Sequence, residues 1–112
     1  MLYTTWTVGD QEYHLRITTK SVVDLEGKLG KNPLEIFMAA SQGKLPMMTE
    51  YAAAFHAALQ PLQHGITEAK VYDILDAYFE EGHNQLDLIP TLLEVFQSSG
   101  LIGKETGESE KN

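Results

Sequence analysis

Two different spacings of apolar residues divide the chain. Between residues 12 and 17 apolar and polar side chains alternate, and a period of two predicts a strand with one buried face. The runs 2–8 and 12–18 flank Gly9-Asp10, so a β-hairpin is predicted over about residues 2–18. A lone hairpin is only marginally stable, so it must pack on the rest of the chain or add to another sheet.

From about Thr19 the apolar residues recur every three or four positions, which predicts helices. Gly30 is a typical helix stop, and Asn32-Pro33 is a typical helix start, with a capping residue and a proline in the first turn. Gly43 is expected to end the second helix. The predicted helices cover about residues 19–29, 33–42, 47–59, 68–81 and 86–98.

The last three predicted helices differ in character. The third is rich in alanine, which permits close helix packing. In the fourth, apolar residues between Val71 and Phe79 follow the spacing i, i+3, i+4, i+7, i+8, the clearest amphipathic pattern in the chain. The fifth begins either at Asp87, with Pro90 in its first turn, or nearer Asn84, with Pro90 kinking it. Its apolar positions cover more than one stripe, so it is expected to be buried on two sides or in an oligomer.

These elements predict an α+β fold in which the N-terminal hairpin packs on about five short helices. Residues 1–102 are expected to form one globular domain, with the helices between 19 and 99. Residues 103–112 contain no apolar side chain and are expected to form a disordered polar tail.

The charge is uneven along the sequence. Residues 1–31 hold four acids and four bases, whereas residues 32–112 hold twelve acids and four bases and so carry the whole formal charge of −8. An acidic surface disfavours nucleic acid and favours a basic or amphipathic protein partner, although such charge also simply keeps a protein soluble. No apolar run is long enough to span a bilayer, and no signal peptide is recognisable.

The sequence contains no recognisable catalytic or metal-binding motif. It has no cysteine, and none of its four histidines has a second ligand at a metal-binding spacing. Asp73, Asp76 and Glu80 share one side of the fourth predicted helix, but acids are expected on the solvent face of an amphipathic helix. We therefore expect a protein that is not an enzyme and that uses neither a metal nor a cofactor. The histidines are His14, His56, His64 and His83.

Aromatic side chains on the helix faces are the remaining candidates for partner binding. Core packing accounts for most aromatic residues at helical spacing. Tyr72 lies off the main apolar stripe of its helix and is the better candidate for a contact surface. The candidate partner-binding residues are Phe37, Tyr51, Phe55, Tyr72, Tyr78 and Phe96.

The order of these segments resembles that of a known family. The run VDLEGKLGKNPLEIFMAASQGKLP (23–46), an alanine-rich helix, HGITEAKVYDILDAYFEEG (64–82) and a leucine-rich last helix follow a hairpin that carries VGDQEY (8–13). This order is similar to that of the tail assembly chaperones of long-tailed phages, in the branch found in gene transfer agents and Gram-positive prophages. The resemblance covers about residues 2–100 and lies in the order and spacing of the motifs.

The resemblance implies a non-enzymatic role in the cytoplasm of the bacterial host. Such chaperones bind the tape measure protein, keep it soluble, assist assembly of the tail tube subunits around it, and are absent from the mature virion. Homo-oligomers are also possible for such a domain. Two other readings stay open: a structural head–tail connector or tail-completion protein, and a protein–protein adaptor with no phage role.

Overall fold

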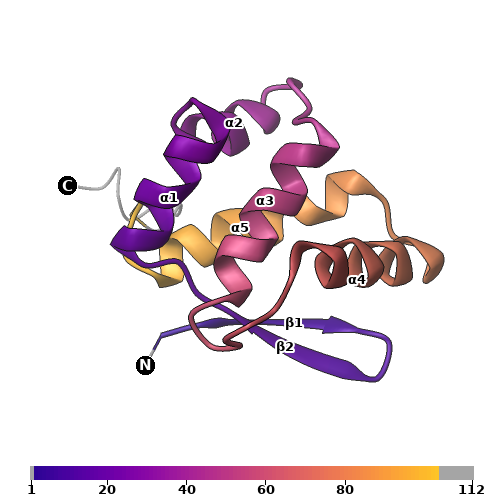
Figure 1. Ribbon diagram of the computed structural model, residues 1–112. Coiled ribbons are helices and arrows are strands. Elements are labelled where there is room, and N and C mark those ends of the chain that lie inside the picture. The colour runs from indigo at the N-terminus through magenta and orange to yellow at the C-terminus, as the bar shows by residue number, and fades with distance from the viewer. Residues whose placement is uncertain (1, 104–112) are drawn as a thin grey trace.

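A computed structural model describes residues 2–103, and over these residues an N-terminal hairpin precedes five helices (Figure 1). The predicted α+β fold class is confirmed. The tail expected over 103–112 lies outside the described residues from residue 104 onward. The elements are β1 (Thr4–Val8), β2 (Gln11–Leu15), α1 (Thr19–Leu29), α2 (Pro33–Ala40), α3 (Met48–Leu59), α4 (Glu68–Glu80) and α5 (Gln85–Ser98).

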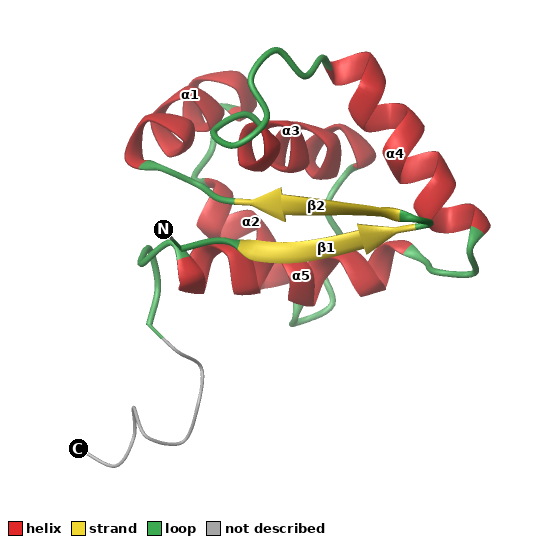
Figure 2. Cartoon of the chain, turned by 90° about the horizontal axis from the view of Figure 1, so that it is seen from below, coloured by secondary structure: helices red, strands yellow, loops and turns green. Residues whose placement is uncertain are grey.

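The hairpin covers one side of the helices with its apolar face. β1 and β2 pair antiparallel, with Val8 opposite Gln11 across the two-residue turn. Trp6 and Leu15 point into the core, while the alternate positions, including His14, are exposed. Figure 2, seen from below, shows the two strands lying in front of the helices. The helices therefore supply the burial that the hairpin needs to be stable.

Helix α3 lies at the centre of the molecule and packs against α1, α4, α5 and β2. Its alanines are buried, so neighbouring helices approach closely, as the small side chains predict. Just after β2, the Arg16 N–H donates a hydrogen bond to the Ala58 carbonyl at 2.9 Å, which joins the hairpin to α3.

Capping residues set most helix ends where the sequence places them. Side-chain oxygens of Asn32 and Thr67 accept backbone N–H groups at the starts of α2 and α4. Helix α2 ends at Ala40, slightly earlier than expected. The turn that follows it still ends at Gly43. There the Lys44 N–H bonds the Ala39 carbonyl at 3.2 Å, and Gly43 adopts a φ of 97°, a closure that satisfies the last carbonyls of the helix.

Helix α5 begins after Asn84, and this settles its two possible starts. The Asn84 side chain accepts from the Leu86 N–H, and the Asp87 carboxylate accepts from the Asn84 N–H, so both candidate residues belong to one capping box. Pro90 lies inside the helix and is exposed. Contacts with α2, α3 and β1 bury most of the apolar side chains of α5, while Leu86 at its start stays exposed. Within residues 2–103 no helix has the length and apolar character to cross a membrane.

Candidate functional site

An open groove separates the first half of α3 from α4, and its floor and walls are mainly apolar. It encloses about 270 Å³. The α4 side presents residues 72, 75, 76 and 79, which follow the helical spacing i, i+3, i+4, i+7 and so share one face. This groove is lined by Met48, Thr49, Ala52, Tyr72, Leu75, Asp76 and Phe79, and it is called the α3–α4 groove below.

Large apolar side chains are exposed at this end of the molecule. Met48 and Tyr72, which line the groove from opposite helices, are 44% and 51% exposed. Leu45 and Met47, in the segment leading into α3, are exposed as well, but they do not line this groove, and Leu45 lines a separate hollow beside α2. Single exposed apolar residues are common, but two that line one groove from different helices are typical of a protein-interaction site.

Carboxylates border the same groove. Asp76 lines it, and Asp73 and Glu80 are exposed on the same side of α4 because of their i, i+3, i+7 spacing. Residues 45–103 contain eight acidic residues and one basic residue, Lys70, which gives this part of the chain a formal charge of −7. The α4 side of the groove is therefore bordered by negative charge.

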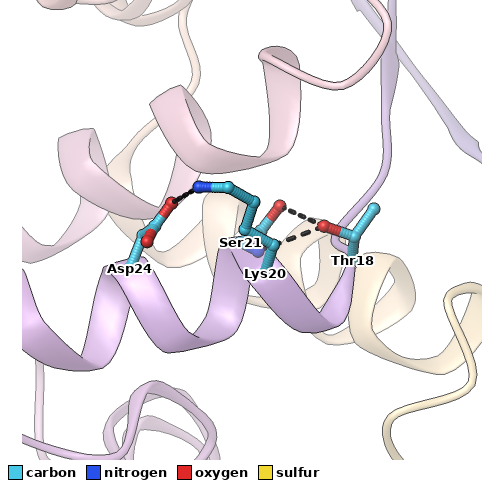
Figure 3. Close-up of polar contacts among 4 residues, drawn as sticks. All are labelled: Thr18, Lys20, Ser21 and Asp24. Atoms are coloured by element: carbon cyan, nitrogen blue, oxygen red, sulfur yellow. Dashed lines mark hydrogen bonds and ion pairs between the residues drawn. The ribbon is translucent and has the colours of Figure 1, made fainter.

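A larger hollow of about 460 Å³ lies at the start of α1, where four of its polar residues contact one another (Figure 3). Thr18 Oγ1 accepts the Ser21 N–H at 3.1 Å and lies 2.9 Å from Ser21 Oγ. Lys20 Nζ donates to Asp24 Oδ2 at 2.9 Å. These contacts are a helix cap and an exposed ion pair, which are common structural features of a helix start.

A third hollow, of about 280 Å³ between α2 and α3, contains the buried acid Glu50. Its Oε1 accepts the Met47 N–H at 2.8 Å, and its Oε2 lies 3.7 Å from Lys31 Nζ. Because a methionine side chain cannot cap α3 in return, this carboxylate supplies the side-chain part of the cap alone. Glu50 is therefore a structural acid with both oxygens engaged.

The histidines take structural positions. His56 Nε2 lies 2.9 Å from the Ile66 carbonyl oxygen. The rings of His14 and His83 stack on tyrosines, and His64 is exposed. Within residues 2–103 no three His, Cys, Asp or Glu side chains converge in a way that could hold a metal ion.

Five of the six aromatic residues predicted to contact a partner lie in the core. Phe37 packs against Phe96 with ring centroids 6.3 Å apart, and Phe55 packs against Trp6 at 4.4 Å. Buried side chains have almost no surface to offer a partner in this fold, and a partner role for these five stays an untested prediction. Tyr72 is the one of the six that is exposed. The buried five are Phe37, Tyr51, Phe55, Tyr78 and Phe96.

Two core tyrosines are held in their neutral form. The Tyr51 hydroxyl is buried without a hydrogen-bond partner, and burial raises the pKa of Tyr51 above its usual value of 10. The pKa of Tyr78 is raised chiefly by burial and further by the charges of Asp87 and Glu81, against a lowering by the Trp6 indole. Neither hydroxyl is set up as a base at neutral pH.

The sequence pattern of one protein family matches residues 2–112. That family is DUF6096, described as a family of unknown function. The chain belongs to DUF6096. No curated protein and no solved structure matches it. Membership assigns no activity, so the α3–α4 groove is the feature from which a function of this DUF6096 member can be argued.

Most residues of the groove carry no separate signal in the sequence. Leu75 and Phe79 fall on the amphipathic stripe that predicts the core of this DUF6096 chain, and Met48 stands at a helix start with no distinguishing pattern. One signal was available. Tyr72, Leu75 and Phe79 are spaced i, i+3, i+7, which marks a second stripe beside the core-facing one.

Proposed function

We propose that this DUF6096 member is a phage tail assembly chaperone. It binds the tape measure protein in the cytoplasm of the bacterial host, keeps it soluble and assists the tail tube subunits in assembling around it. This is the role implied by the resemblance over residues 2–100. The role needs no catalytic residue, metal or cofactor.

The α3–α4 groove is the observation that carries the proposal. A tape measure protein is a long helical chain with apolar stripes, and exposed apolar stripes aggregate unless something covers them. A groove between two helices covers such a stripe by accepting the helix along its length. Many copies bound along one client gain avidity from individually weak contacts, and their acidic surfaces keep the complex in solution.

The test is co-expression with the protein encoded immediately downstream, if that protein is long and helical. We expect that protein to be soluble and to co-purify with this chain, and to be insoluble when expressed alone. An insoluble, unbound partner would contradict the proposal.

A second measurement separates the chaperone from a connector or a tail-completion protein. Mass spectrometry of purified particles should find no stoichiometric amount of this chain, because a chaperone leaves before the virion matures. A structural amount in the particles would favour the connector. An adaptor with no phage role predicts that no tape measure gene lies beside this one.

A further inference from the structure

We infer that the α3–α4 groove binds one amphipathic α-helix of the client, whose apolar stripe is flanked by Lys or Arg on the side that faces α4. The inference rests on the proposed function, because it takes the client to be a helical protein. It adds the binding face and the chemistry that selects the bound segment.

The shape of the groove suits a helix. The α4 wall presents its side chains at helical spacing, so a partner helix can pack against it while its anchors reach the start of α3. The α4 residues that line the groove run from Tyr72 to Phe79 and extend about 10 Å, since each helical residue rises about 1.5 Å. A groove of this length faces about two turns of a partner helix, which is enough for apolar anchors at i, i+4 and i+7.

The apolar lining suits a client whose sequence varies along its length. Met48 is unbranched and adapts its shape to different partners, as methionines do on promiscuous binding surfaces. Tyr72 offers a large, stiff surface at low cost in conformational entropy. Together Met48 and Tyr72 can contact an apolar stripe made of different apolar side chains.

The charges decide which helices bind. Asp76 lies in the groove, and Asp73 and Glu80 continue the negative border along α4. A helix with Lys or Arg beside its apolar stripe meets these carboxylates, whereas an acidic helix meets like charge. The same border disfavours a second copy of this chain as the occupant, because residues 45–103 of that copy also carry a formal charge of −7.

Three synthetic peptides of about 18 residues, or about five helical turns, test this on the full chain. One has a leucine stripe flanked by lysine, one has the same stripe flanked by glutamate, and one has the lysine composition with the leucines scrambled. Titration followed by fluorescence anisotropy should show the lysine-flanked peptide binding at least about tenfold more tightly than the other two, and less tightly at high salt. Equal binding of the lysine- and glutamate-flanked peptides would overturn the inference.

Matched variants test the location. Tyr72→Lys and Asp76→Lys change exposed groove residues, while Val23→Lys and Glu94→Lys make the same charge changes at exposed positions outside the groove. We expect the groove variants to lose at least about tenfold in affinity and the controls to change by less than about threefold. Thermal unfolding confirms that all four fold. Equal losses in groove and control variants would overturn the assignment to this groove.

Two outcomes separate the inference from the function on which it rests. If no peptide binds but the downstream protein still co-purifies, the inference fails and the chaperone role stands. If the lysine-flanked peptide binds but the downstream protein stays insoluble, the groove chemistry stands and the role fails. A dimer in sedimentation that Tyr72→Lys dissociates would make a second copy the occupant and overturn the inference.

Discussion

Individual aromatic residues show what sequence spacing can and cannot decide. Phe37 and Tyr72 both lie on helices, and an apolar stripe serves a core and a partner surface equally well. The difference appears only when the elements are placed in space: Phe37 has no exposed surface, and Tyr72 is half exposed. The off-stripe position of Tyr72 was the only local sign, and it indicated exposure correctly.

The unpartnered hydroxyl of Tyr51 makes a first prediction. Tyr51→Phe removes a buried polar group that has no hydrogen-bond partner, so the free energy of unfolding should stay the same or rise by up to about 1 kcal/mol. Urea denaturation measures this, with Tyr72→Phe at an exposed site as the neutral control. A loss of more than about 1 kcal/mol for Tyr51→Phe would show that the hydroxyl has a partner.

The raised tyrosine pKa values make a second prediction, at alkaline pH. The folded chain keeps the protons of Tyr51 and Tyr78 at pH values where the unfolded chain has lost them, because their folded pKa lies above 10. Stability from these groups is therefore complete below pH 10 and falls as the pH rises above it.

Denaturation across this pH range measures that loss. Because other groups also titrate there, the informative quantity is the difference between wild type and the double variant Tyr51→Phe, Tyr78→Phe. The double variant should lose less stability above pH 10. If the free energies of unfolding of wild type and the double variant fell in parallel above pH 10, the raised tyrosine pKa values would be contradicted.

At the scale of elements, helix ends were the most predictable feature. Asn32 and Thr67 cap α2 and α4 as their side chains predict, because capping depends on residues that are close in sequence. The start of α5 was ambiguous for a physical reason. Asn84 and Asp87 are both good capping residues, and in the fold they serve the same cap from its two ends.

Two glycines, one inside α1 and one directly after it, give a matched prediction. Gly30 ends the helix with a φ of 70°, which a side chain strains, so Gly30→Ala should lower the free energy of unfolding by about 1 kcal/mol. Gly27 lies inside the helix, and a methyl group there meets no atom within 4 Å, so Gly27→Ala should raise it by about 0.5–1 kcal/mol. Urea denaturation of both variants checks the signs. Equal signs would mean that one of the two backbone conformations is different in solution.

At the scale of the whole molecule, the hairpin is anchored by long-range packing that no local pattern reports. Trp6 of β1 packs against Phe55 of α3, with ring centroids 4.4 Å apart, and against Tyr78 of α4, with ring centroids 5.5 Å apart. The sequence predicted a hairpin that must pack on something, and it could not say on which helices. The groove was unpredictable for the same reason, since its two walls come from helices that are separate in sequence.

The packing of Trp6 makes a prediction at this scale. Trp6→Ala should lower the free energy of unfolding by about 3–5 kcal/mol, because it empties a buried aromatic site between three elements. Thr5→Ala, on the exposed face of the same strand, should change it by less than about 0.5 kcal/mol. Urea denaturation compares the two. A small loss for Trp6→Ala would mean that the hairpin contributes little to the core.

The central claim is that this chain holds a helical client in the α3–α4 groove. The most direct measurement is the amount of the downstream helical protein that stays soluble and co-purifies with wild type, Tyr72→Lys and Val23→Lys, each co-expressed with it. The account predicts that wild type and Val23→Lys retain the client and that Tyr72→Lys loses most of it. Equal recovery of the client with wild type and both variants would contradict the account, and so would a failure to recover the client with any of the three.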